Sequence, residues 1–541
     1  MQLLSAVLCC RQDYFPPRRY IFMNVSWRVA KKKVNLRLNQ TNQKNYYKMA
    51  TNTPAKELLR DKSWARWTAL VLLASAMFFA YIFMDILSPL QEYLQSTKGW
   101  DPMAYGRFAG SETFLNVFVF FLIFAGIILD KMGVRFTAIL SGAVMLIGGF
   151  INYYALTDSF QSSSLAEAMD HFVNLPDTWW NITPFYKGMP ASAKLSAIGF
   201  MIFGCGVEMA GITVSRGIVK WFAGKEMALA MGVEMALARM GVAVVVLGSP
   251  FLATLGDSIN VSRPLAAGVL LLLIGFISFV VYSFMDKKLE NEMGTNGEEK
   301  DDPFKISDLG LILSSKVFWL VALLCVLYYS AIFPFQKYAI NMLQCNLGVT
   351  AQEAGYVFFV FPFGAAAITP ILGNYLDRKG KGATMLILGA ILMIICHLTF
   401  ALVLPATHSA LIAYTAIILL GISFSLVPAS LWPSVPKLVD NRLLGSAYAV
   451  IFWIQNIGLY AFPMIIGAVL AATNPGVDNP MEYNYTVPML VFASLGILAF
   501  FIGIALKALD AKNHYGLELP NIVSKDTKAE ELEAEVISAE E

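Results

Sequence analysis

The sequence predicts an all-α membrane protein in which twelve transmembrane helices form two pseudo-symmetric six-helix bundles. Hydrophobic residues make up 57% of the 541 residues and charged residues only 14%, whereas a soluble domain is about half apolar and a quarter charged. The apolar runs continue for about 20 residues, which is the length of a helix that crosses a bilayer. A soluble enzyme is therefore excluded, and so is a β-barrel, whose strands alternate over about 10 residues.

The chain opens with a polar segment, 1–66, that we expect to be a cytoplasmic tail. Its first 48 residues hold ten Lys or Arg and a single acid, Asp13. From Met49 onward the sequence is an ordinary polar lead into the first helix, so we predict that translation starts there and that 1–48 is not translated. The alternative is a basic tail that binds anionic lipid.

Two sets of six apolar runs follow, separated by a charged stretch. They predict one bundle over 67–286 and a second over 316–510, with a cytoplasmic linker at 287–315 that is too polar to enter lipid, and an acidic cytoplasmic tail at 511–541. The expected helices cover 67–91, 104–129, 135–157, 192–221, 226–255, 262–286, 316–342, 353–376, 382–404, 408–432, 443–472 and 485–510.

The short connectors predict the orientation of these helices. Lys and Arg are concentrated in the connectors that lie on the same side as the two termini. Because such connectors face the cytoplasm, we expect both termini to be cytoplasmic.

One loop pattern occurs twice, at the same place in each half of the chain, which indicates an internal repeat. Its first glycine is expected to let a neighbouring helix approach closely, and its aspartate to face a positive helix amino terminus. The residues concerned are Gly126, Asp130, Lys131, Gly133 and Arg135 in the first copy and Gly373, Asp377, Arg378 and Gly380 in the second.

At these residues the chain resembles the major facilitator superfamily, whose signature loop this is. The resemblance covers nearly all of 67–510 and implies the major facilitator fold, with two bundles that rock about a central site. It also implies that both copies of the loop act as a conformational latch on the cytoplasmic side. The sequence departs from the usual pattern at Val134, where a basic residue normally follows the glycine.

Four further stretches resemble, more narrowly, the family that includes the lysosomal dipeptide transporter of animals. They lie at 203–208, 220–241, 325–335 and 431–458. The resemblance implies a dipeptide transporter, and we expect a bacterial member in the inner membrane; the alternative is a lysosomal membrane.

Two opposite charges lie near the middle of consecutive spans: Glu208 in the fourth and Arg239 in the fifth. An ionisable residue within hydrocarbon is costly and marks a pathway or a partner. We expect a clamp in which Glu208 holds a substrate ammonium and Arg239 a substrate carboxylate; in the resembled family the matching residues are thought to hold the two peptide termini. The alternative is a salt bridge that only ties the two helices together.

Other polar or aromatic residues in the spans are candidates for the wall of the same cavity. Glu112 and Asn116 are open to two interpretations, lining the cavity or capping helix ends, and Lys337 is a candidate for the opposite wall. Glu234 lies five residues before Arg239, about 140° round the helix, so we expect it to point elsewhere, with a proton site as the alternative. The candidates for substrate binding are Asp85, Tyr329, Trp432, Gln455 and Asn456.

These features favour a transporter of a small zwitterion, dipeptides above all, with a proton-coupled exporter of amphipathic compounds or a non-transporting sensor as alternatives. The four histidines are scattered, so we expect no enzyme activity, metal or cofactor. The first span lacks the paired-glutamate stretch of proton-driven peptide transporters, which favours uniport. We expect a monomer that binds lipid and a small-molecule substrate but no nucleic acid, and the sequence indicates no accessory subunit. Asn181 to Thr183 matches a glycosylation acceptor by pattern.

Overall fold

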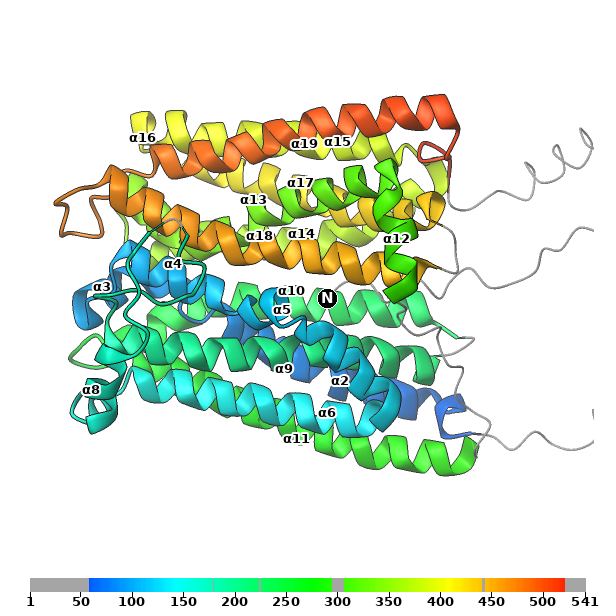
Figure 1. The fold of residues 1–541 in the computed structure, drawn as a ribbon, viewed down its shortest axis with the longest axis horizontal. Coiled ribbons are helices and arrows are strands. Elements are labelled where there is room, and N and C mark those ends of the chain that lie inside the picture. The colour runs from blue at the N-terminus through cyan, green and yellow to red at the C-terminus, as the bar shows by residue number, and fades with distance from the viewer. Residues whose placement is uncertain (1–57, 179, 223–224, 294–305, 440–442, 521–541) are drawn as a thin grey trace, which may run out of the picture.

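The computed structural model describes residues 58–520 except 179, 223–224, 294–305 and 440–442, and this part of the chain is almost entirely α-helical. The long helices lie side by side along one axis (Figure 1). Both ends of the described chain, the blue η1 (Leu59–Asp61) and the red segment after the last helix, lie at the same end of the bundle. The predicted start at Met49 and the acidic tail beyond 520 lie outside the described residues.

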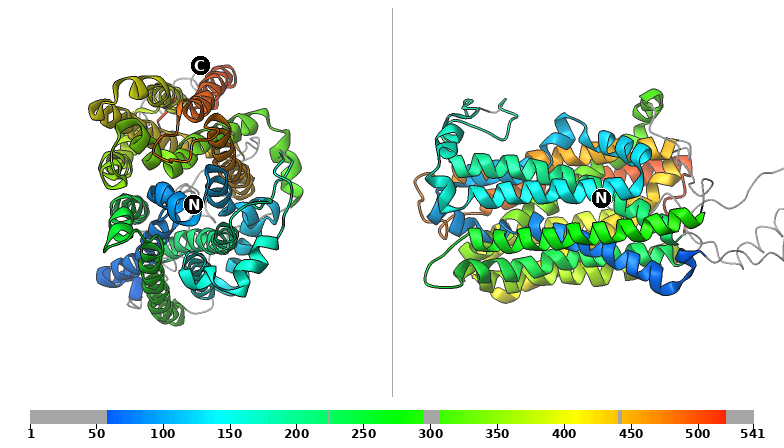
Figure 2. Two further views of the ribbon diagram at one scale, coloured as in Figure 1. Left: turned by 90° about the vertical axis from the view of Figure 1, so that its left-hand side faces the viewer. Right: turned by 90° about the horizontal axis from the view of Figure 1, so that it is seen from below.

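The first half of the chain forms one group of helices, in which α6 packs on α9 and α11 and α2 packs on α10 and α11. Seen end-on, this group lies beside the second half as a separate cluster (Figure 2). The helices of this half are α2 (Ser63–Met84), η2 (Ser88–Leu90), α3 (Gln91–Lys98), α4 (Pro102–Ser111), α5 (Phe114–Phe118), α6 (Phe121–Ala155), α7 (Asp158–Gln161), α8 (Ser164–His171), α9 (Ala191–Phe222), α10 (Met227–Thr254) and α11 (Ser262–Met293).

The second half repeats this arrangement. Its α15 packs on α17 and α19, α13 packs on α18 and α19, and α14 packs on α17. The two halves meet where α10 contacts α14 and where α4 contacts α18. The helices are α12 (Ile306–Ser314), α13 (Lys316–Leu347), α14 (Ala351–Lys379), α15 (Gly382–Leu398), the π-helix η3 (Thr399–Val403), α16 (Leu404–Thr407), α17 (Ala410–Leu438), α18 (Leu444–Thr473) and α19 (Thr486–Asn513).

Within the described residues, eleven helices are long and apolar enough to cross a membrane. The difference from the expected twelve comes from the second span, which is broken into α4, α5 and the start of α6. Phe120, between α5 and α6, has a left-handed backbone (φ 55°). Farther along α6, Gly133 has φ 77° and ψ 168°, where two helices meet at a kink. The end of the second span and the third span therefore form one long helix, α6, and the rest of the second span lies in the short helices α4 and α5.

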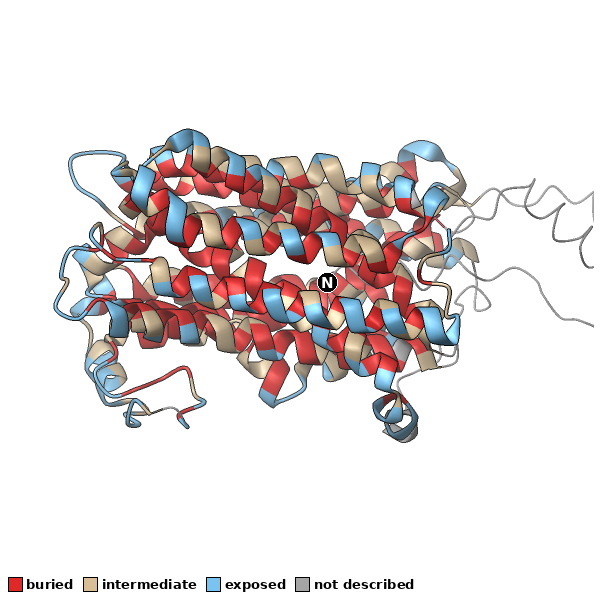
Figure 3. Cartoon of the chain, turned by 90° about the horizontal axis from the view of Figure 1, so that it is seen from above, coloured by how far each residue is buried: buried red, intermediate tan, exposed pale blue. Residues whose placement is uncertain are grey.

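The outer faces of the helices are apolar, as lipid contact requires. Exposed residues follow these outer faces, whereas buried residues lie toward the interior (Figure 3). Leu270, Phe284 and Leu411 are among the most exposed large hydrophobic residues. The chain is a multi-pass integral membrane protein.

The linker predicted at 287–315 contains more helix than its charge suggests. Helix α11 continues through the membrane end to Met293, and α12 occupies 306–314. The extension of α11 is stabilised by ion pairs, since Asp286 and Glu290 both bind Lys220 of α9 at 2.7 and 2.8 Å.

The two halves are closed against one another at the end of the bundle opposite the termini. A Cβ atom added to Gly106 of α4 would lie 2.5 Å from the carbonyl oxygen of Pro463 in α18, so only glycine permits this approach. Nearby, Tyr105 donates to the Lys337 carbonyl at 2.8 Å, and Gln344 donates to Glu92 at 2.6 Å. We call this the outer end and the opposite one the inner end.

Candidate functional site

A cavity lies between the two halves, about midway along α10 and α14. The space between its walls is about 530 Å³ when the part that opens to the exterior is included. Its walls are mostly apolar, with Phe333, Phe361 and Phe424 from the second half. Tyr81, Glu234 and Arg239 from the first half, with Gln336 from the second, supply the polar groups.

Arg239 crosses the boundary between the halves. Its Nη1 donates to the Ala365 carbonyl at 3.1 Å and to the Thr369 hydroxyl at 2.7 Å, both on α14. Its Cζ lies 4.8 Å from the centre of the Phe424 ring, a cation–π contact. These contacts fix the plane of the guanidinium.

One edge of this guanidinium remains available. The Nε of Arg239 is buried and has no hydrogen-bond acceptor among the residues that the structure describes. In a guanidinium, Nε–H and one N–H of Nη2 point the same way and can bind both oxygens of a carboxylate. A buried donor without a partner is costly, so this edge is suited to receive an anionic group from a ligand.

Glu208 is half-buried on α9. It is close enough to Tyr81 and Glu112 for electrostatic interaction. No ion pair joins Glu208 to Arg239 within the described part of the chain, where Arg239 instead binds α14. The tie between α9 and α10 that we considered as the alternative is therefore absent from this conformation.

Glu234 does not point away from Arg239 as the helical spacing suggested. Both residues line the same cavity, and Glu234 is only 9% exposed. The cavity is wide enough to be bordered by a broad face of α10, because Met235, Ala238 and Val242 line it too. Two long side chains can therefore reach the same cavity even though their Cα atoms lie about 140° apart around the helix.

Asp85 belongs to a cluster of charges on the outer side of the cavity. Its Oδ1 accepts from Lys337 Nζ at 2.8 Å and from Ser88 at 3.0 Å, and its Oδ2 accepts from Gln336 at 2.6 Å. Lys337 also lies 4.0 Å from Glu112. Asp85 is on the first half and Lys337 on the second, so this buried pair joins the halves, and three donors already bind the Asp85 carboxylate in this conformation.

The remaining predicted wall residues lie in the second half. Trp432 donates to the Tyr329 hydroxyl at 3.1 Å, and Tyr329 stacks on Phe333, which lines the cavity. Gln455 accepts from the Cys325 thiol at 3.4 Å, and Asn456 is buried. Tyr329 and Trp432 thus support the aromatic wall, whereas neither amide is among the residues that line the cavity.

The first latch copy surrounds a tight turn at the inner end. Asp130 lies 3.4 Å from Arg216 of α9, and Arg135 lies 2.6 Å from Glu290 of α11. Lys131 is exposed. The expected close helix approach at Gly126 is wrong for this conformation, since no atom from another described segment lies within 4 Å of a Cβ placed there.

The second latch copy contacts the beginning of the segment that is predicted as an acidic cytoplasmic tail, 511–541. A Cβ at Gly380 (φ 71°) would collide with the backbone of 518–520. Lys381 and Gly382 donate their N–H groups to the carbonyls of Glu518 and Leu517 at 2.9 and 3.0 Å. Among the described residues, a Cβ at Gly373 would also meet no other segment within 4 Å. Asp377 is half-buried and Arg378 is exposed.

We expect Asp130→Ala to lower the transport rate more than the substrate affinity. The Asp130–Arg216 pair is partly exposed and contributes at most about 1 kcal/mol to stability, and it lies far from the cavity. Its loss should change the balance between the inward and outward states. The transport rate and the substrate affinity are measured in proteoliposomes. The control is Asp158→Ala, which removes an exposed carboxylate at the outer end. Equal rates for Asp130→Ala and the parent would contradict the latch.

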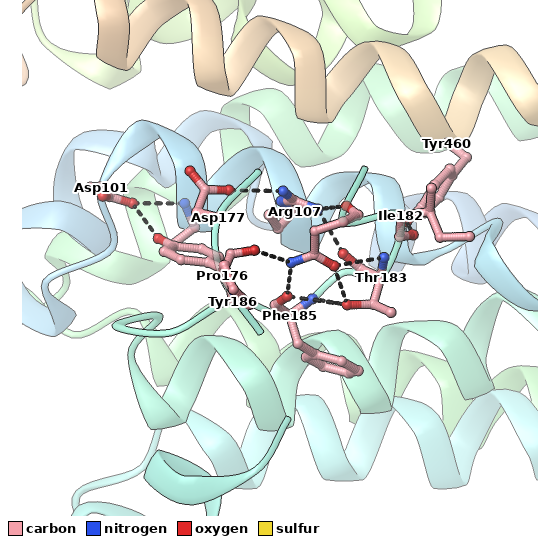
Figure 4. Close-up of polar contacts among 11 residues, drawn as sticks. Asp101, Arg107, Pro176, Asp177, Ile182, Thr183, Phe185, Tyr186 and Tyr460 are labelled. Atoms are coloured by element: carbon pink, nitrogen blue, oxygen red, sulfur yellow. Dashed lines mark hydrogen bonds and ion pairs between the residues drawn. The ribbon is translucent and has the colours of Figure 1, made fainter. Parts of the chain in front are cut away.

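At the outer end, Arg107 of α4 organises the loop between α8 and α9 (Figure 4). Its Nη1 donates to the carbonyls of Asn181 and Thr183 at 2.7 Å each, and its Nη2 donates to Asp177 at 3.0 Å. Tyr460 of α18 donates to the Ile182 carbonyl. The loop therefore binds both halves.

The glycosylation pattern at Asn181 is not accessible in this fold. The side-chain nitrogen of Asn181 donates to the carbonyls of Pro176 and Phe185, and its oxygen accepts from Thr183 (Figure 4). Beside it, burial and the neighbouring Asp101 carboxylate raise the pKa of Tyr186, which keeps that hydroxyl a donor to Asp101.

The chain matches the Major Facilitator Superfamily model over residues 73–463 and 338–520. The lysosomal dipeptide transporter MFSD1 of Danio rerio is 26% identical over 414 residues, which cover 75% of this chain and 80% of that protein. The human MFSD1 is 27% identical over 289 residues, 51% of this chain and 59% of the relative. The partially occluded inward-open xylose transporter XylE from E. coli aligns with a TM-score of 0.58 at 13% identity, covering 81% of this chain and 99% of XylE. These similarities confirm the expected fold class and family.

Proposed function

The chain belongs to the Major Facilitator Superfamily, and on that premise we propose that it moves a small zwitterion, dipeptides in particular, across the membrane by alternating access. The superfamily and its fold are those of transporters. The two units that would move are the bundles predicted at 67–286 and 316–510, about the cavity between them.

The available edge of Arg239 is the observation that carries this proposal. It is a two-donor site for a carboxylate inside a cavity between the halves. Bidentate binding of a carboxylate by arginine is strong and specific for planar anions. A substrate carboxylate would thereby be held close to α14, to which Nη1 is already bonded.

Glu208 is the partner that we assign to the substrate ammonium. It lies on α9 and is not among the residues that line the cavity in this conformation, but it interacts electrostatically with Tyr81, which does line it. The carboxylate and ammonium of a dipeptide are farther apart than those of an amino acid, which suits two sites on different helices. The similarity to animal dipeptide transporters supports the same substrate class.

A counterflow assay with the purified protein in liposomes tests the proposal. Liposomes are loaded with an unlabelled dipeptide, and uptake of labelled dipeptide is measured against external dipeptides, single amino acids, xylose, nucleosides and an amphipathic cationic dye. We expect only dipeptides to compete strongly. Competition by the dye alone would favour the exporter instead, and the absence of any counterflow would favour a sensor.

The membrane of a bacterial cell and the lysosomal membrane are both compatible with this function. We propose the bacterial inner membrane. Localisation of the tagged native protein by membrane fractionation distinguishes the two.

A further inference from the structure

A short segment after α19 lies across the inner end of the second half, and we call its residues 515–520 the strap. Helix α19 is followed by His514, which has a left-handed backbone with φ 55°, and Gly516 turns the chain again with φ 83°. The strap then runs along the loop between α14 and α15, with Leu517 buried and Leu519 exposed. These two turns direct the chain back across the second half.

The strap binds the second latch copy through its backbone and one carboxylate. The N–H groups of Lys381 and Gly382 donate to the strap carbonyls of Glu518 and Leu517 at 2.9 and 3.0 Å. The Glu518 carboxylate accepts from the N–H and the hydroxyl of Thr384 at 2.8 Å each, at the positive amino terminus of α15. Four hydrogen bonds thus join the strap to one loop.

The same position in the loop is open in the first half. Gly133 and Gly380 have the same place in the repeated pattern, and both have a left-handed φ, of 77° and 71°. A Cβ at Gly133 would meet no atom from another described segment within 4 Å, whereas a Cβ at Gly380 would collide with the backbone of the strap. While the strap is seated, no other segment can approach the second latch copy at this glycine.

A pair of charges gives a second comparison between the halves. In the first half, Lys220 in the last turn of α9 binds Asp286 of α11 directly, at 2.7 Å. These helices are the fourth and sixth spans of their half. The fourth and sixth spans of the second half are α17 and α19, which carry Lys437 and Asp510 near their inner ends. The second half therefore has the residues for the same pair.

The strap lies between these two residues of the second half. Lys437 donates to the strap carbonyls of Gly516 and Leu519 at 3.0 and 2.9 Å. Asp510 accepts from the N–H of Leu517 at 3.1 Å. Lys437 and Asp510 interact electrostatically, but no ion pair joins them in the described part of the chain. The strap thus takes the place of the direct pair that the first half forms.

We propose that the strap is a releasable lock on the second latch copy. While it is seated, the loop between α14 and α15 is bound to its own half and is closed to the first half at Gly380. When it leaves, Lys437 and Asp510 pair directly, as the corresponding residues do in the first half, so release leaves neither charge without a partner. The loop is then open at its glycine, like the first latch copy, and can contact the first half.

The lock assigns the strap to one of the two transport states. The strap is seated in the conformation whose outer end is closed, so this conformation is the locked one. Exchange with the opposite conformation brings the inner ends of the halves together, which requires the second latch copy to be free of the strap. Release therefore belongs to each transport cycle. This rests on the proposed alternating access but not on the identity of the substrate.

Fixing the strap to the loop tests whether release is required. In the double variant Lys381→Cys, Glu518→Cys, a short reducible thiol cross-linker joins the strap to the loop, and mass spectrometry measures the fraction of molecules that are joined. When most molecules are joined, we expect dipeptide counterflow to fall by at least about tenfold and to recover on reduction. The two single variants, treated with the same reagent, are the controls and should keep their rates.

A second measurement detects release without transport. Leu517→Cys places a thiol in the buried part of the strap, which a water-soluble maleimide reaches only after release. Mass spectrometry of the peptide that contains residue 517 measures the labelling rate. Adding Glu518→Ala removes the carboxylate that binds Thr384 and should speed this labelling by about tenfold or more. Lys512→Cys, at an exposed position near the end of α19, is the control and should react at once with or without Glu518→Ala.

Three results would overturn the inference and leave the proposed function intact. An undiminished counterflow rate in the cross-linked protein would make the strap a permanent part of the fold. No labelling of Leu517→Cys, even with Glu518→Ala, would mean that the strap does not leave. Equally fast labelling of Leu517→Cys and Lys512→Cys would mean that the strap is not seated. Loss of dipeptide counterflow in the parent would instead refute the proposed function, and the labelling rates would still decide on the lock.

Discussion

Lys337→Met is expected to destabilise the solubilised protein strongly and to stop transport. The Asp85 side chain is only 2% exposed and the ion pair is 2.8 Å long. Removing one partner of such a pair leaves a buried charge without compensation, which costs about 3–5 kcal/mol. The Met84 carbonyl, which also accepts from Lys337 at 2.9 Å, loses its donor as well. Thermal unfolding monitored by intrinsic fluorescence measures the effect.

A surface pair provides the control for this prediction. Lys98 and Asp158 lie 3.3 Å apart, with the Asp158 side chain 91% exposed, so Lys98→Met should change stability by no more than about 1 kcal/mol. The double variant Asp85→Asn, Lys337→Met should regain much of the lost stability, because neither charge is then left alone. Equal destabilisation by Lys98→Met and Lys337→Met would show that the buried pair has no special role.

The second large effect is expected from Arg239→Lys. Lysine keeps the positive charge but cannot present two parallel donors to a carboxylate. The loss of one charge-assisted hydrogen bond corresponds to about 1.5–3 kcal/mol, or roughly a 10- to 150-fold weaker affinity for a free dipeptide. Isothermal titration of the solubilised protein measures it.

Arg263→Lys is the matched control for Arg239→Lys. Arg263 binds the carbonyls of Leu255 and Ser258 in the connector after α10, away from the cavity. Its replacement should leave dipeptide affinity unchanged. An affinity that survives Arg239→Lys would mean that the substrate carboxylate is bound elsewhere.

The positions of the helices could be predicted from the sequence because each span has its own continuous apolar run. The second span was the exception. Its expected range, 104–129, is divided by breaks that depend on how the chain packs, and Phe120 adopts a left-handed backbone that its sequence does not favour. The sequence predicts a loop at Gly133. In the structure the two helices are joined there directly, through a kink.

The site could be predicted only in part. Arg239 was identifiable as a charge in the middle of a span. The pairing of Asp85 with Lys337 was not, because the two residues are far apart in the sequence and belong to different halves. Periodicity describes one helix at a time, so it assigned Glu234 to another face, whereas the shape of the cavity is determined by how several helices pack together.

The contact of the second latch copy with the chain end also depends on tertiary structure. Glu518 accepts from the backbone N–H and the hydroxyl of Thr384, at 2.8 Å each, at the start of α15. A carboxylate at a helix amino terminus is favourable, but nothing in the local sequence links these two segments. By contrast, the repeated loop pattern was visible because it lies within one short stretch in each half.

The central claim, that Arg239 and Glu208 hold the two ends of a dipeptide, is tested most directly by the thermal stabilisation of the parent protein with end-blocked ligands. A free dipeptide should raise the unfolding temperature most. The amino-acetylated and carboxy-amidated forms should each raise it less, and the doubly blocked form should have no effect. In Arg239→Lys the free and amidated dipeptides should become alike, since the carboxylate no longer has a two-donor partner. Identical shifts for the free and doubly blocked dipeptides in the parent protein would contradict the clamp.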